Sequence, residues 1–197
     1  MKNPDSPLRP PTALAIAYAP VPVRRRLAWL LTLDQRLLSI LERTTEPMIA
    51  QLRLSWWRDA LKLTPGKRPK GEPLLAELNQ IEPDDALIDA GLLLVDAFEI
   101  LATGGDSAEQ DTARNQRISA ICDAFAIWVD CAEPQRKRID YIADWWGDAA
   151  MPMPKSIPRV LRPLSILALA EQMESLDSTA SSARHGLRLN WHALTGR

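Results

Sequence analysis

The stretch RRRLAWLLTLDQRLLSILER, residues 24–43, repeats its leucines with the period of an α-helix. At about 100° per residue, six leucines fall on one narrow arc and polar side chains occupy the opposite side. These are Leu27, Leu30, Leu31, Leu37, Leu38 and Leu41. Because Trp29, Leu33 and Ile40 widen the apolar arc, we expect this helix to be buried over more than half its circumference.

One acidic residue interrupts this apolar arc. Asp34 stands seven residues after Leu27 and seven before Leu41. A carboxylate in that position must be paired with a cation, hydrogen-bonded, protonated or turned towards a polar cavity. The sequence leaves these alternatives open and marks Asp34 as a candidate cavity residue.

Helical periodicity continues along the rest of the chain, interrupted by Pro, Gly and polar stretches. We expect helices at about 24–43, 47–63, 73–80, 83–104, 107–132, 135–150, 159–174 and 179–194. No segment alternates convincingly at period two, and no internal repeat is visible. The sequence therefore predicts an all-α, single-domain bundle of six to eight helices, formed by residues 24–197. Residues 1–23 contain six prolines and are expected to form a Pro-rich N-terminal arm.

The helix expected at 47–63 has caps at both ends. Pro47 suits its first turn, and Pro65 and Gly66 end it. One face of this helix carries the large apolar side chains, namely Met48, Ile49, Leu52, Trp56, Ala60 and Leu63.

Composition excludes several classes of protein. Hydrophobic residues make up 46% and charged residues 25% of the chain, which is ordinary globular usage. A net charge of −1 offers no basic field for nucleic acid, and two cysteines with two histidines are too few for a disulfide framework or a zinc site. No run approaches the ~18 apolar residues of a transmembrane segment, and no signal-peptide pattern is visible, so we expect a cytoplasmic protein.

The segment RLSWWRDAL, residues 53–61, carries a family resemblance. It follows Glu46 and Pro47 and precedes PLLAEL at 73–78, and this order resembles the squalene/phytoene synthase family of head-to-head trans-isoprenyl diphosphate synthases. The family stretch R-L-x-W-W-R matches Arg53, Leu54, Trp56, Trp57 and Arg58, while Arg24 to Ala28 are similar to the basic start of the preceding helix. RPLSILALAE at 162–171 is similar to a late Pro-containing helix. The resemblance implies an isoprenoid synthase fold.

Active members of that family hold Mg²⁺ with two aspartate-rich motifs, and the metal neutralises the departing diphosphate. The first motif, DxxxD, belongs on the helix before RLxWWR, where this chain offers Asp34 alone. Asp140, Asp144 and Asp148 lie along one edge of a later helix, either as metal ligands replacing the second motif or as a charged surface stripe. No stretch like the family's QxxNxxRD occurs, and the chain is shorter than typical active members.

Basic and aromatic side chains near the motif are candidate ligands. Arg24, Arg25, Arg53 and Arg58 offer charge for a diphosphate, and Arg53 is placed to lie against an indole three or four residues away. Two roles are compatible with the residues of this motif, including Trp56: they either pack against the rest of the fold or line a ligand cavity. Separately, the aspartates of the helix at 83–104 lie opposite its apolar positions and are expected to be solvated; they are Asp85, Asp89 and Asp96.

The resemblance implies two functions. The eroded acid motifs favour a degenerate, noncatalytic relative, acting by protein contact, like a group that resembles an assembly factor for respiratory complex I, or by holding a prenyl lipid. The alternative is an active Mg-dependent prenyltransferase that condenses prenyl diphosphates in isoprenoid and carotenoid (terpenoid) biosynthesis. Magnesium is expected only in the second case. Contact with the inner face of a membrane is compatible with a prenyl ligand, although no strongly basic amphipathic helix marks it.

Overall fold

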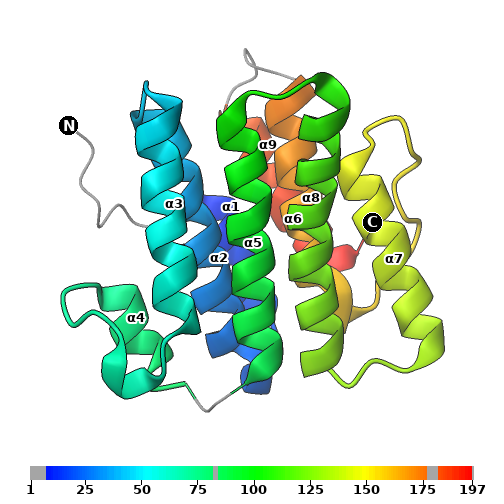
Figure 1. Cartoon of the computed structure of the whole chain (residues 1–197). Helices are drawn as coiled ribbons and strands as arrows, with labels where there is room; N and C mark the ends of the chain where they lie inside the picture. The colour runs from blue at the N-terminus through cyan, green and yellow to red at the C-terminus, as the bar shows by residue number, and fades with distance from the viewer. Residues whose placement is uncertain (1–7, 82–83, 177–181, 197) are drawn as a thin grey trace. The chain divides into compact units, whose positions relative to one another are not determined.

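The computed structural model describes residues 8–81, 84–176 and 182–196, and this part of the chain contains nine α-helices, two short 3-10 helices and no strand (Figure 1). The helices are α1 (Pro10–Tyr18), α2 (Val21–Arg43), α3 (Pro47–Lys62), α4 (Pro73–Leu78), α5 (Asp85–Thr103), α6 (Ser107–Trp128), α7 (Glu133–Gly147), α8 (Arg162–Leu176) and α9 (Ser182–Thr195), with η1 (Pro65–Lys67) and η2 (Arg159–Leu161) between them. The all-α prediction is confirmed, and eight of these helices lie where the periodicity predicts them.

The additional helix, α1, lies in the segment that we expected to be an extended arm, and for residues 10–18 that expectation is wrong. Pro10 and Pro11 occupy the first turn of α1. Backbone N–H groups in the first turn of a helix make no intrahelical hydrogen bond, so proline, which has no N–H, costs nothing there. Thr12 and Ala15 are buried, and α1 packs against α8. Prolines therefore start this helix rather than prevent it.

The chain divides into two compact units, one formed by residues 25–130 and the other by residues 1–24 together with 131–197. The described residues before Arg25 belong with the C-terminal helices, because α1 finds its partners in α8 and α9.

In the unit of residues 25–130, α5 is the central helix and packs on both α3 and α6 (Figure 1). Gly91 of α5 is buried at a close approach: a Cβ there would lie 3.3 Å from Leu61 Cδ1 and 3.4 Å from Leu33 Cδ2. Its small size lets α5 lie against side chains from both α2 and α3. The core around it is built from leucine and large aromatic side chains, with Trp29, Leu33, Leu37, Leu54, Leu94, Phe98 and Phe125 fully buried.

Capping groups fix where α5 and α6 begin and end. The Asp84 carboxylate accepts a hydrogen bond from Leu87 N (3.2 Å) and forms an ion pair with Arg26 Nε (2.7 Å). Gly104 closes α5 in the left-handed conformation (φ 66°), which glycine adopts without steric cost. Asp106 then caps α6 by accepting from Glu109 N.

In the other unit, α8 packs against α1, α7 and α9. It is buried along most of its described length, and its polar groups pair with the neighbouring helices. His192 Nε2 lies 2.9 Å from Ser165 Oγ, and Trp146 Nε1 donates to Glu171 Oε2 at 3.0 Å. Ile139, Ile142, Trp145 and Trp146 form the buried side of α7.

Candidate functional site

Asp34, the acid on the leucine arc of α2, is paired with an arginine of α6. Arg117 donates from Nε to Asp34 Oδ1 at 2.6 Å and from Nη2 to Oδ2 at 2.8 Å. The Asp34 side chain is 8% exposed and that of Arg117 is 15% exposed, so water screens this pair little. Of the alternatives that the sequence leaves open, the structure shows the paired acid, and both carboxylate oxygens are engaged.

The sequence reasoning missed Arg117, which lies 83 residues after Asp34. A signal for it exists. Arg117 stands four residues after Ala113 and four before Ile121, both buried, so it interrupts the apolar stripe of α6 as Asp34 interrupts that of α2. Two opposite charges on two apolar stripes favour a buried pair.

Arg58 of α3 is paired with two acids of α5. It donates to Asp96 through Nε at 3.2 Å and through Nη2, and its Nη2 lies 2.7 Å from Glu99 Oε2. The hydrogen bond to Asp96 raises the pKa of Arg58 above its ordinary value, partly opposed by burial and supported by the charges of Asp96 and Glu99. Asp96 was expected to be only solvated; it is part-exposed but also paired.

An open pocket with a volume of about 850 Å³ lies beside this ion pair. Its wall carries one arginine, Arg58, against four carboxylates: Asp96, Glu99, Asp106 and Glu109. The acids outnumber the cation, so the electrostatic potential of this pocket disfavours a diphosphate.

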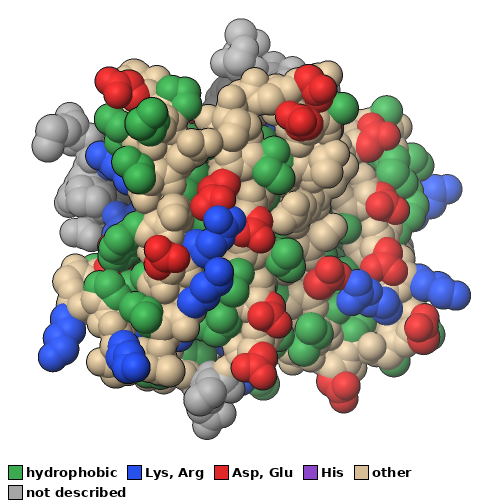
Figure 2. Space-filling view, viewed as in Figure 1, with side chains coloured by type: hydrophobic (Ala, Val, Ile, Leu, Met, Phe, Trp, Pro, Cys, Tyr) green, Lys and Arg blue, Asp and Glu red, His purple; other side chains and the backbone are tan. Residues whose placement is uncertain are grey.

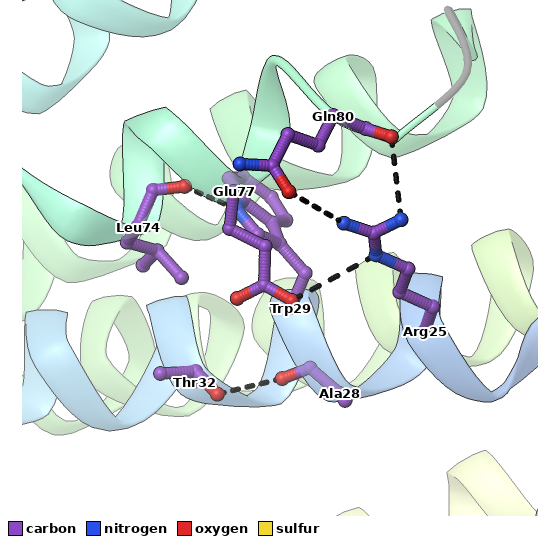
Figure 3. A network of polar contacts seen from close by, with 7 residues as sticks. All are labelled: Arg25, Ala28, Trp29, Thr32, Leu74, Glu77 and Gln80. Carbon is purple, nitrogen blue, oxygen red and sulfur yellow. Dashed lines mark hydrogen bonds and ion pairs between the residues drawn. The ribbon is translucent and has the colours of Figure 1, made fainter.

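Two further basic candidates have local roles. Arg24 donates to Ala17 O (3.1 Å) and Ala19 O (3.0 Å), and thus satisfies carbonyl groups at the end of α1. Arg25 donates to the backbone and side-chain oxygens of Gln80, each at 3.3 Å, beyond the end of α4. Figure 3 shows this contact with the one from Trp29 Nε1 to Leu74 O, at 2.8 Å, and together they hold α4 against α2.

The two adjacent tryptophans of α3 point to different environments. Trp57 is 3% exposed and packs in the core, whereas Trp56 is 42% exposed. Their rings meet edge to face, with centroids 5.2 Å apart. Arg53, also exposed, donates to Thr44 Oγ1 at 3.3 Å. Trp57 therefore has a packing role in the core, while Trp56 and Arg53 are accessible to a partner.

The face of α3 that the sequence marks as apolar is turned to solvent except at Ala60, which is buried. The buried side of the helix is a second apolar stripe, formed by Ala50, Leu54, Trp57 and Leu61, with Ala60 beside it. We call the exposed stripe the outer face of α3, and its members are Met48 (72% exposed), Ile49 (40%), Leu52 (67%), Trp56 (42%) and Leu63 (38%), the last just past the helix end. Figure 2 shows hydrophobic side chains gathered over the beginning of α3.

A groove with a volume of about 420 Å³ runs beside the outer face, between α2, α3 and the start of α4. Its floor is apolar, and its lining residues are Arg36, Ile40, Ile49, Leu52, Arg53, Trp56, Trp57 and Glu72. Arg36 Nη2 and Glu72 Oε1 form an ion pair at 3.0 Å, and Glu72 also caps α4 by accepting from Leu74 N. The groove wall is thus held by polar contacts, and its floor and outer rim offer apolar surface.

Asp140 and Asp144 of α7 lie on the surface, as does Asp148 just past the end of the helix. Asp140 pairs with Arg136 Nε (3.0 Å) one turn earlier, and Asp148 Oδ1 accepts from Ala150 N. Asp144, between them, is exposed as well. Within residues 8–81, 84–176 and 182–196, no three His, Cys, Asp or Glu side chains are grouped so that they would hold a metal ion. Of the two interpretations of this run, the geometry matches the charged surface stripe.

We compared the chain with known protein families, characterised proteins and solved structures. No family model, no characterised protein and no solved structure matches the chain. The resemblance carried by residues 53–61 therefore stays a prediction. Of the helices that the structure describes, none is both long enough and apolar enough to cross a membrane.

Proposed function

We propose that this chain is a noncatalytic helical protein of the squalene/phytoene synthase type, and that it works by contact with another protein through the outer face of α3. The observation that carries the proposal is the exposure of Leu52, Trp56 and their apolar neighbours beside an open groove. A contiguous apolar patch on a folded domain is a common mark of a binding surface. Trp is also among the residues most enriched where interfaces gain their binding energy.

The state of Asp34 supports the noncatalytic half of the proposal. Magnesium in a prenyl diphosphate synthase needs several carboxylate oxygens. Both oxygens of Asp34 bind Arg117, and Arg58 is neutralised by Asp96 and Glu99. A metal or a diphosphate would have to compete with these ion pairs.

An activity assay tests this half. The purified chain is incubated with farnesyl or geranylgeranyl diphosphate and Mg²⁺, and diphosphate release and hydrocarbon products are measured. We expect no product above the protein-free control. Magnesium-dependent product that is lost in Asp34→Asn, in a variant shown by circular dichroism to be folded, would instead establish the prenyltransferase alternative.

Prenyl-lipid binding is a second noncatalytic candidate, favoured by the apolar floor of the groove beside Trp56. Calorimetric titration with farnesol separates it from protein contact. Saturable heat that disappears in Trp56→Glu supports a lipid ligand, whereas no heat in either protein favours protein contact.

A cellular experiment tests the binding half. Following the family resemblance, the partner would belong to respiratory complex I assembly, so deletion of the gene is expected to lower NADH:quinone oxidoreductase activity. Leu52→Glu with Trp56→Glu is expected to reproduce the deletion. Ile127→Glu is the matched control, since Ile127 of α6 is 61% exposed but lies outside the outer face. Unchanged activity in the deletion strain argues against the assembly role, and full activity with the double variant argues against the outer face.

A further inference from the structure

The outer face of α3 is flanked by cations that the chain does not neutralise. Residues 43–70 hold seven Lys and Arg against two Asp and Glu, a net charge of +5 in a chain whose total is −1. Within the described part of the chain, Arg58 alone of the seven has a carboxylate within ion-pairing distance, and the half-buried Arg68 donates to the amide oxygen of Asn79. The five others are exposed and have no carboxylate partner: Arg43, Arg53, Lys62, Lys67 and Lys70. Figure 2 shows Lys and Arg side chains around the end of α3 and near α4.

Three of these cations precede, line or end the helix that carries the apolar stripe. Arg43 precedes α3, Arg53 lines the groove next to Trp56, and Lys62 is the last residue of the helix. From Met48 to Leu63 the stripe extends about 20 Å at ~1.5 Å per residue. The surface is therefore an apolar stripe and groove in a segment whose cations, in spite of the exposed Glu46 and Asp59, outnumber its acids.

From this surface we infer the chemistry of the occupant, and the inference rests on the function proposed above. We propose that the outer face of α3 binds an amphipathic helix whose apolar side chains enter the groove and whose flanking residues are acidic. A helix laid along a groove places its i, i+3, i+4 and i+7 side chains on one line, as the stripe requires. Acidic residues on its flanks supply the carboxylates that the five cations lack.

An anionic membrane is a less suitable occupant. The Arg36–Glu72 ion pair is part of the groove lining, and a bilayer laid over the groove would have to desolvate it. A protruding side chain fits a recess, and a flat bilayer does not.

Binding of model peptides to the whole purified chain tests the inference. The probe is a fluorescein-labelled amphipathic peptide of about 20 residues, long enough to be helical, with leucines on one face and glutamates on its flanks. A matched peptide carries lysine at every glutamate position. We expect the acidic peptide to bind, with affinity falling as salt is raised, and the basic peptide to bind at least about tenfold more weakly.

Variants locate the contact. Trp56→Ala is expected to weaken binding of the acidic peptide on the order of 30-fold, as for an anchor at the centre of an interface. Arg53→Glu is expected to weaken it about tenfold and to improve binding of the basic peptide, a reciprocal change that loss of folding would not produce. Ile127→Glu changes an exposed apolar residue of α6, 61% exposed, and is the control that is expected to leave both affinities unchanged.

Other outcomes overturn the inference in distinct ways. Equal binding of both peptides contradicts acidic selectivity. Binding to vesicles of 7:3 phosphatidylcholine and phosphatidylglycerol, about the charge of an anionic leaflet, with no peptide binding, replaces the helix by a membrane. A dimer in sedimentation that Leu52→Glu dissociates makes a second copy the occupant. If no peptide binds while Leu52→Glu with Trp56→Glu still reproduces the gene deletion, the occupant is wrong and the proposed function stands.

Discussion

Asp34 and Arg117 show how one residue's role depends on its partner. On α2 alone, a carboxylate among leucines is a defect that costs free energy. The guanidinium of Arg117 donates one hydrogen bond to each carboxylate oxygen of Asp34. These two bonds neutralise the negative charge and give both oxygens a donor. The pair also favours one alignment of α2 against α6, because a shift of the helices would separate the buried carboxylate of Asp34 from the guanidinium that binds both of its oxygens.

We predict that Asp34→Asn lowers the free energy of unfolding by about 3–5 kcal/mol, because it removes the carboxylate charge that pairs with Arg117 in a poorly solvated site. Urea denaturation followed by circular dichroism measures the change. The double variant Asp34→Leu with Arg117→Met is expected to recover most of the loss, since it removes both charges. A loss below about 1 kcal/mol in the single variant would mean that the pair is screened by water.

At the scale of elements, α3 is a helix with two apolar faces. Leu54, Trp57 and Leu61 follow each other at helical spacing and so do Leu52, Trp56 and Leu63. Periodicity alone cannot decide which stripe is buried. The neighbouring helix decides it: α5 approaches closely at Gly91, and Leu61 fills the space that a side chain there would occupy.

Two leucines two positions apart test this orientation. Leu54→Ala is expected to cost about 2–5 kcal/mol of unfolding free energy, because Leu54 is fully buried and its removal leaves a cavity. Leu52→Ala is expected to cost less than about 0.5 kcal/mol, because that side chain is 67% exposed. Thermal or urea unfolding of both variants measures the difference, and a larger effect at Leu52 would reverse the assignment of the faces.

At the scale of the whole molecule, the charge is unevenly distributed. The net charge of the chain is −1, but residues 43–70 have a net charge of +5, so the remaining residues have a net charge of −6. Such a separation creates a local positive potential that a net-charge estimate does not reveal. It also explains why the formal charge of the chain is a poor guide to its partners.

Retention on a sulfonate cation-exchange resin tests this distribution. Lys67→Glu with Lys70→Glu is expected to elute at clearly lower salt than Lys137→Glu with Lys155→Glu, although both variants have the same net charge and all four lysines are exposed. The reason is that the first pair lies in the positive segment, and screened electrostatics act over only about 10 Å. Identical elution of the two variants would mean that no local field exists.

The sequence by itself determined the helical class and most helix positions, because apolar spacing, proline and glycine act within a few residues of one another. The same local signals were sufficient for α1, whose prolines at positions 10 and 11 start a helix, although their number suggested an arm. The sequence also singled out Asp34 as anomalous and contained the charge imbalance of residues 43–70.

Only the tertiary structure decided which groups meet. It gave Asp34 its partner from α6, gave Arg58 two acids from α5, and buried the second apolar stripe of α3 instead of the one that contains Trp56. The physical reason is that periodicity describes a single helix, whereas burial and ion pairing depend on a neighbour contributed by a distant part of the chain. The candidate site on α3 was therefore visible in the sequence as an apolar face, and only packing left it exposed.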